Sequence, residues 1–284
     1  MRTLARSGDA AEVGADPASW RGTGAFTQLR VLTARQLAVV YGDRRIALFT
    51  VLQPIIMLML FSQVFGSMAD PASFPGGVRY VDYLIPALLV TTGIGSAQGA
   101  GLGLVREMES GMVARFRFLP VSPPLVLVAR SLTDLVRVLG QLLTLLACGW
   151  VVLRFEPTGG LAGLGAAVVL ALLMSWSLMW VFIALATWLR SIEVLSSVGF
   201  LVTFPLMFAS SAFVPLDALP GWLQLVAAFN PVTYAVEAAR HLALGWSAGG
   251  TVLAALATSL GLAVCAALVA VRGYRRPPNE RRGG

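Results

Sequence analysis

Six long apolar runs, separated by short segments that hold most of the charged residues, are the dominant pattern of this chain. Each run is close to or longer than the roughly 20 residues that an α-helix needs to cross about 30 Å of hydrocarbon. The pattern predicts an all-α polytopic membrane protein with six transmembrane helices, over about residues 46–65, 84–105, 135–153, 161–189, 194–213 and 249–271. The first run starts too far along the chain for a cleavable secretory signal, so we expect it to remain in the mature protein.

The segment before the first run divides into two parts. Residues 1–25 are predicted to be a disordered N-terminal segment. Residues 26–45 place apolar side chains on one helical face with arginines around it, a pattern typical of a helix that lies in the head-group plane. This N-terminal interfacial helix is interpreted either as a cytoplasmic connector helix or only as a membrane-surface anchor.

Residues 209–245, between the fifth and sixth runs, contain Pro215, Pro220 and Pro231. Proline interrupts a helix and is tolerated mainly in its first turn, so we expect two short helices, over about 216–229 and 231–244. Neither is long enough to cross the bilayer. Non-helical backbone at membrane depth must be covered by protein or face water, so the segment is predicted to form a re-entrant helical hairpin at the outer leaflet.

Composition agrees with a membrane protein, because 57% of the residues are hydrophobic and only 12% are charged, against about 25% charged in soluble domains. One transmembrane domain, residues 26–271, and a basic cytoplasmic tail, residues 272–284, account for the chain. All 21 basic residues are arginines, and eighteen fall on the side of the two termini; the others are Arg79, Arg154 and Arg240. Arginine-rich loops stay cytoplasmic, so both termini are predicted to be cytoplasmic in a multi-pass protein of the inner membrane. Anionic lipids explain the net charge of +7, and no nucleic-acid partner is expected.

The absence of lysine excludes one class of mechanism. A phosphate-binding loop G-x-x-x-x-G-K-[ST] needs a lysine, so this chain is not expected to hydrolyse ATP itself. His241, Cys148 and Cys265 do not form a ligand cluster at zinc spacing, and we expect neither a metal site nor a catalytic residue. A lipid-modifying enzyme would need clustered His, Asp or Glu near the head groups, and the sequence has no such cluster.

The six runs, the proline-broken segment and above all the pattern Pro231-x-x-Tyr234-x5-Arg240 resemble the membrane subunit of ABC-2 type exporters. The stretch GMVARFRFLPVSP, residues 111–123, is similar to the daunorubicin and doxorubicin resistance permeases of that family. The resemblance implies two permease copies, expected to be a homodimer, docked on two copies of a separate ATPase subunit. ATP and Mg would be bound by that ATPase, and no cofactor by this chain. The resemblance also implies that the segment between the second and third spans contacts the ATPase.

That segment begins with Glu107 and Glu109 and continues with Arg115 and Phe116 among apolar residues. A snorkelling loop that only obeys the positive-inside rule would explain the arginines but not the acids. We therefore favour an ATPase-coupling loop made by these four residues. Further along, Arg130, Asp134 and Arg137 share one helical face and can neutralise one another at the cytoplasmic rim.

Two regular side-chain patterns lie inside the apolar runs. Gly95, Gly99 and Gly103 repeat every four residues, which predicts a face where another helix backbone approaches closely or, as the alternative, a lining role. Phe200, Phe204 and Phe208 are aligned in the fifth run. Such a stripe faces lipid or core in most proteins; the alternative is an apolar gate on the substrate path that stacks on planar aromatic cargo at the dimer axis.

Glu237, Arg240 and His241 are close on one helical face of the expected hairpin. An ion pair that pins the hairpin is favoured over a pH-sensitive outer gate, which depends on His241 alone. We expect Tyr234 to hydrogen-bond within the hairpin that Pro231 opens.

The function predicted from these features is that of a permease subunit of an ATP-driven exporter. It would move a hydrophobic or amphiphilic compound, an antibiotic or drug, across the cytoplasmic membrane. Export of a lipid-linked glycan or glycolipid is the alternative within the same architecture. A lipid-modifying enzyme and a non-transporting channel or immunity protein are the alternatives from other classes.

Overall fold

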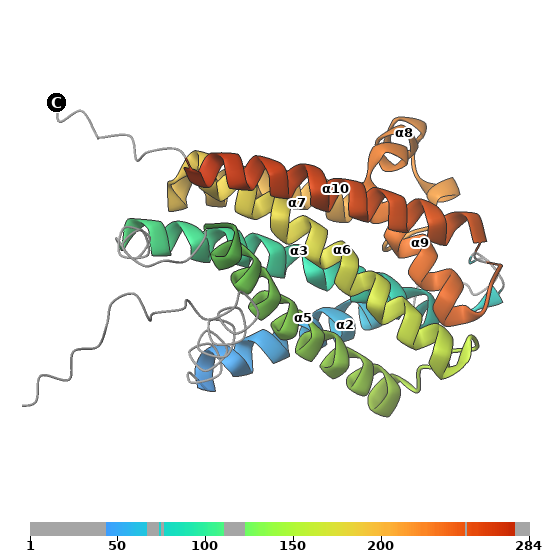
Figure 1. The fold of residues 1–284 in the computed structure, drawn as a ribbon. Helices are drawn as coiled ribbons and strands as arrows, with labels where there is room; N and C mark the ends of the chain where they lie inside the picture. Colours follow the sequence, from blue (N-terminus) through green and yellow to red (C-terminus); the bar gives the residue numbers. More distant parts are fainter. Residues whose placement is uncertain (1–43, 67–73, 75–76, 111–122, 248, 276–284) are drawn as a thin grey trace, which may run out of the picture.

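The computed structural model describes residues 44–66, 74, 77–110, 123–247 and 249–275 (Figure 1). All regular structure in these residues is helical, as predicted. The helices are α2 (Arg44–Gly66), α3 (Tyr80–Glu109), α5 (Pro123–Leu153), α6 (Gly160–Leu189), α7 (Ile192–Phe208), the 3-10 helix η4 (Leu216–Ala218), α8 (Gly221–Phe229), α9 (Pro231–Leu244) and α10 (Gly249–Arg275). The predicted interfacial helix lies, apart from its last two residues, outside the described part of the chain, as do the predicted disordered segment and most of the basic tail.

Four described helices are long and apolar enough to cross a membrane, namely α3, α5 from Val126, α6 and α10 as far as Tyr274. The apolar parts of α2, Leu52–Gly66, and of α7 are shorter. At 1.5 Å per residue, α7 is roughly 26 Å long, slightly less than the hydrocarbon thickness. The predicted fifth span was too long at its end, because the helix stops at Phe208, three residues after Pro205.

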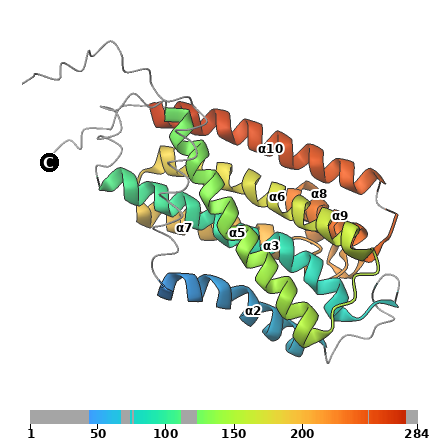
Figure 2. The ribbon, with the colours of Figure 1, turned by 60° about the horizontal axis from the view of Figure 1, so that its bottom comes forward.

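The helices form an elongated bundle in which α3 and α6 are central (Figures 1 and 2). Most of the apolar stretch of each is buried, whereas most of α5 and α10 faces outward. Helix α6 packs against α3, α9 and α10, and α5 crosses α2 and α3 obliquely. At one end of the bundle, α3, α6 and α10 end and α2, α5 and α7 begin. We call this the arginine end, because Arg106, Arg130, Arg190 and Arg272 lie near it. The other, where α8 and α9 lie, is the hairpin end.

Close packing of α3 on α6 depends on Gly93 and Gly101. A Cβ atom at Gly101 would lie 2.8 Å from the carbonyl oxygen of Phe182, and one at Gly93 would overlap Ser175. No described helix backbone approaches Gly95, Gly99 or Gly103 within 4 Å in this way, so the close approach favoured there is not made within the described residues. Gly95 instead lines a cavity, which was the alternative role.

Side chains, and not a helix backbone, lie beside two of those three glycines. The Arg137 and Arg130 guanidinium groups lie against Gly99 and Gly103, and no atom lies within 4 Å of a Cβ at Gly95. A four-residue repeat identifies a face without small side chains, but it does not say what fills the space.

The segment between α7 and α10 contains the two helical pieces that its prolines predict, with one correction. The expected helix over 216–229 is interrupted, because Leu219 precedes Pro220 and adopts an extended conformation that separates η4 from α8. Helix α9 has the predicted bounds and packs against α3, α6 and α10. Among the described elements, α8 packs mainly against η4 and α9. It projects from the bundle, and Trp222 and Phe229 are exposed (Figure 1).

Candidate functional site

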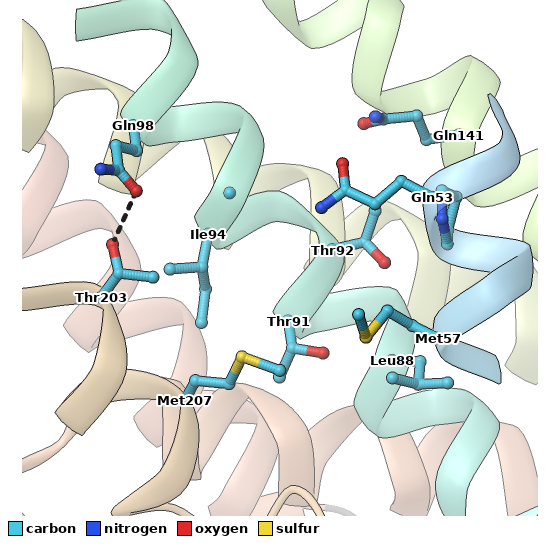
Figure 3. A pocket seen from close by; sticks show the side chains of 12 residues that line it. Gln53, Met57, Leu88, Thr91, Thr92, Ile94, Gln98, Gln141, Thr203 and Met207 are labelled. Atoms are coloured by element: carbon cyan, nitrogen blue, oxygen red, sulfur yellow. Dashed lines mark hydrogen bonds between the residues drawn. The ribbon is translucent and has the colours of Figure 1, made fainter. Parts of the chain in front are cut away.

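A cavity of about 280 Å³ lies between α2, α3, α5 and α7 (Figure 3). Six of its twelve lining residues are polar and uncharged, although most of the surface that lines the cavity is apolar: these are Gln53, Thr91, Thr92, Gln98, Gln141 and Thr203. The rest is apolar, apart from Gly95, and none of the lining residues carries a charge. The sequence signal for this site was present but not used: Gln53, Gln98 and Gln141 each interrupt a different apolar run.

Hydrogen bonds between helices hold two of the glutamines in place. The Thr203 hydroxyl donates to Gln98 Oε1 at 3.4 Å, which joins α7 to α3 (Figure 3). Gly199 makes room for this side chain, since a Cβ there would lie 2.7 Å from Gln98 Nε2. The Ser96 hydroxyl donates to Gln141 Oε1 at 2.7 Å, which joins α3 to α5. Three of the four helices around the cavity are thus tied together by polar groups.

The hydroxyls of Thr91 and Thr92 behave differently from other helical threonines of this chain. Thr133, Thr144 and Thr258 each donate to the carbonyl oxygen four residues earlier, as helical threonines in apolar surroundings do. Neither Thr91 nor Thr92 donates a side-chain hydrogen bond to any residue of the described chain. Their donor groups are therefore available to a molecule in the cavity.

A charged network joins α3 to α5 between the cavity and the arginine end. Arg137 pairs with Asp134 at 3.0 Å, Arg130 lies 4.0 Å from the same carboxylate, and Arg130 also pairs with Glu107. The predicted mutual neutralisation along α5 is confirmed. The participation of Glu107, which lies on α3, was not predicted.

This network is continuous with the cavity. Arg130 Nε donates to the Ala100 carbonyl at 3.3 Å, and Arg137 Nη2 donates to the Ser96 carbonyl at 3.4 Å. Because the Ser96 hydroxyl binds Gln141, polar contacts extend from Glu107 to the wall of the cavity.

The four residues of the predicted coupling loop are only partly described. Glu107 and Glu109 belong to the last turn of α3; Glu107 is half-buried and paired, and Glu109 is exposed. Arg115 and Phe116 lie outside the described residues.

The phenylalanine stripe lies on the outer surface of α7, away from the cavity, which Thr203 and Met207 of that helix line. Ring centroids of Phe200 and Phe204 are 5.6 Å apart, and those of Phe204 and Phe208 4.6 Å apart. Phe200 is 67% exposed, so the stripe is open to lipid or to another subunit.

Arg240 is completely buried at the hairpin end. It pairs with Glu237 at 2.9 Å, donates to the carbonyl oxygens of Tyr83 and Ala212 at 3.1 and 2.7 Å, and lies 3.5 Å above the Tyr83 ring. Burial lowers the pKa of the guanidinium, while Tyr83 and Glu237 act in the opposite direction. The predicted ion pair is confirmed. His241 is outside it, with Nδ1 2.5 Å from the Ser247 carbonyl oxygen.

Asn230 and Pro231 shape the start of α9. Asn230 Oδ1 accepts the Val232 N–H at 2.9 Å and caps α9, where Pro231 occupies the first turn. Asn230 Nδ2 donates to the carbonyl oxygens of Leu206 and Ala209 at the end of α7. The expected hydrogen bond of Tyr234 within the hairpin is present, to the Ala228 carbonyl at 2.7 Å. The double role of Asn230 was not predicted.

Metal-ligand side chains are not gathered in the described residues, where no group of three or more His, Cys, Asp or Glu could hold an ion. Cys148 and Cys265 are both free thiols.

Comparison with known proteins identifies the class. The family model described as ABC-2 type transporter matches residues 27–244, and the chain belongs to that family. It is therefore a multi-pass membrane protein, and the resemblance seen in its sequence is confirmed.

Several relatives carry more specific names. The chain is 30% identical over 226 residues to the daunorubicin resistance ABC transporter permease protein DrrB1 of Streptomyces coeruleorubidus, covering 79% of this chain and 78% of that protein. It is 28% identical over 249 residues to the probable doxorubicin resistance ABC transporter permease protein DrrC of Mycobacterium tuberculosis (strain ATCC 25618 / H37Rv), covering 87% and 86%. It is also 26% identical over 226 residues to the putative transport permease ycf38 of Cyanophora paradoxa, covering 76% and 74%.

Proposed function

We propose that this chain is the membrane subunit of an ATP-driven exporter of a hydrophobic or amphiphilic compound, of the antibiotic or drug type. The observation that carries the proposal is the cavity with its six uncharged polar residues, which lies between four apolar helices of an ABC-2 type chain. Polar groups within apolar helices are costly unless they serve packing or a ligand, and Thr91 and Thr92 have donors to offer. The printed names of two relatives, both drug-resistance permeases, support the cargo class.

In this proposal α2, α3, α5, α6, α7 and α10 are the six spans, and α8 with α9 is the re-entrant hairpin at the outer leaflet. The arginine end faces the cytoplasm together with both termini. Arg79 donates to the Arg154 carbonyl at 2.7 Å, so two of the three arginines assigned to the outer side lie together at the hairpin end.

The proposed assembly has two permease copies and two ATPase subunits, which bind ATP and Mg. Glu107, Glu109, Arg115 and Phe116 form or flank the segment that docks on the ATPase. Helices α3 and α5 flank that segment, and the Glu107–Arg130 pair ties them together. Movement of the docking segment would therefore move both helices, and through Ser96 and Gln141 it would reach the cavity.

Phe200, Phe204 and Phe208 have a separate role in the proposal. Two copies would bring their α7 stripes together and form an apolar gate beside the path. We expect Phe204→Ala to change the relative export rates of aromatic cargo; the same rates for all compounds as in the wild type would contradict the gate.

The test is reconstitution in proteoliposomes, with and without an ABC ATPase subunit that copurifies with this chain and carries a G-x-x-x-x-G-K-[ST] loop. Nile red, an uncharged amphiphile, reports transport by fluorescence. ATP-dependent movement that needs both subunits supports the proposal. Transport by the permease alone, or none by the complex, contradicts it.

A lipid-linked glycan is a second candidate cargo, because carboxamides and hydroxyls suit sugar hydroxyls. The same vesicles, loaded with a fluorescent polyprenyl-linked sugar, separate the two cargoes.

A further inference from the structure

We propose that the cavity selects its cargo through an uncharged, oxygen-rich group, such as a sugar or a polyhydroxylated ring, and discriminates against a cationic head group. The inference rests on the proposed export function and adds the chemical class that the cavity accepts. It is argued from four properties of the lining.

The first property is the kind of polar group. Three carboxamides and three hydroxyls can donate and accept hydrogen bonds, whereas a carboxylate only accepts and a guanidinium only donates. A hydroxyl-rich ligand needs both partners side by side. Glutamines from α2, α3 and α5 and threonines from α3 and α7 supply them around one space (Figure 3).

The second property is the charge next to the cavity. Arg137 is bound to the Ser96 carbonyl, beside the bond that holds Gln141. The nearby acid, Asp134, is already flanked by Arg130 and Arg137. A cationic head group would lose its hydration and find no counter-charge among the described residues that line the cavity.

The third property is the availability of the Thr91 and Thr92 hydroxyls, which do not donate hydrogen bonds within their own helix. Both residues line the cavity, so a ligand that supplies acceptor oxygens can receive hydrogen bonds from these hydroxyls. A quaternary ammonium group has no acceptor to offer, and an alkyl chain has none either.

The fourth property is size. At about 280 Å³ the cavity is just below the range for drug-sized ligands, roughly 300 to 1,000 Å³. It accommodates one ring or head group of a larger cargo. Met57, Leu88, Ile94 and Met207 provide an apolar wall for the carbon skeleton attached to it (Figure 3).

The experiment measures binding to the full chain in lipid nanodiscs, with empty nanodiscs as the partition reference. Radiolabelled decyl glucoside, decyltrimethylammonium and decanoate differ only in head group. We expect saturable binding of the glucoside above the empty-disc level and at least tenfold weaker binding of the trimethylammonium compound. Equal or tighter binding of the cation to the wild type overturns the inference.

Side-chain variants locate the binding. Thr92→Val and Thr203→Val keep the side-chain shape and remove a hydroxyl, so each should weaken glucoside binding about 3- to 10-fold. The matched control is Thr144→Val, whose hydroxyl bonds to the Gly140 carbonyl of its own helix. Cavity variants that bind the glucoside as tightly as Thr144→Val overturn the inference.

A gain of function provides the second arm. Gln98→Glu retains an oxygen for the Thr203 hydroxyl and introduces a negative charge, so at pH 8 binding should shift towards the trimethylammonium compound.

If head-group selectivity fails in a complex that still transports with ATP, the inference alone is wrong. If selective binding persists without ATP-dependent transport by the complex, the proposed function is wrong.

Discussion

At the scale of single residues, Arg240 shows how a charge is kept inside this protein. The guanidinium donates hydrogen bonds to three segments of the chain. Its partners are the Tyr83 carbonyl on α3, the Ala212 carbonyl between α7 and η4, and the Glu237 carboxylate one turn earlier on α9. Planar geometry with several fixed donors suits this arrangement, and lysine cannot reproduce it.

We expect Arg240→Ala to lower the stability of the chain in nanodiscs by about 3 kcal/mol, because it leaves Glu237 and two carbonyls without their partner. Arg240→Lys should lie between this variant and the wild type. Thermal unfolding followed by fluorescence measures both, and Arg272→Ala, at an exposed arginine, is the control. Equal melting of the Arg240→Ala and Arg272→Ala variants would refute the structural role.

Gly101 gives a second prediction at this scale. Gly101→Ala places a methyl group 2.8 Å from the Phe182 carbonyl oxygen, so α3 and α6 must separate. Overpacking of this kind costs about 1 to 3 kcal/mol. Gly165→Ala, with no atom within 4 Å of the new methyl group, should instead stabilise α6 by up to about 1 kcal/mol. The same melting assay compares the two, and a Gly101→Ala protein as stable as Gly165→Ala would contradict the packing.

At the scale of helices, the pair α3 and α5 carries the proposed coupling. Because Glu107 and Arg130 contact each other, the effects of Glu107→Ala and Arg130→Ala on transport per ATP hydrolysed should not add. The double variant should be no worse than Arg130→Ala alone. Glu109→Ala, at an exposed position, should instead weaken ATPase binding and combine additively with Arg130→Ala. Strictly additive effects for the Glu107 and Arg130 variants would exclude a coupling role for the Glu107–Arg130 pair.

Hydropathy predicted the existence of these helices better than their ends. Helix α5 begins at Pro123, well before the predicted 135, because Arg130 is accommodated by contacts to Ala100 and Glu107 of α3, which are distant in sequence. Helix α7 ends at Phe208 because its last carbonyls are bound by Asn230, a residue from the start of α9.

At the candidate site too, contacts between sequence neighbours were predictable and contacts between distant residues were not. Contacts between neighbours in sequence, such as Glu237 with Arg240, follow from helical spacing and were predicted correctly. The cavity was not predicted, because its polar residues come from four helices and only the packing brings them together.

At the scale of the whole molecule, the exposed apolar surface must face lipid or another subunit. Leu201 on α7 and Leu253 on α10 are 71% and 69% exposed, yet the proposed dimer covers only the first. Helix α10 packs against α5, α6 and α9, on a different side of the bundle from α7 (Figure 2).

Cysteine cross-linking tests this asymmetry in a background where Cys148 and Cys265 are replaced by serine. If two copies meet along α7, Leu201→Cys in the assembled complex should form a dimer with a short bifunctional thiol reagent, because equivalent positions near a twofold axis face each other. Leu253→Cys, equally exposed, should not. Dimers through Leu253→Cys alone would move the interface to α10 and return the phenylalanine stripe to the lipid.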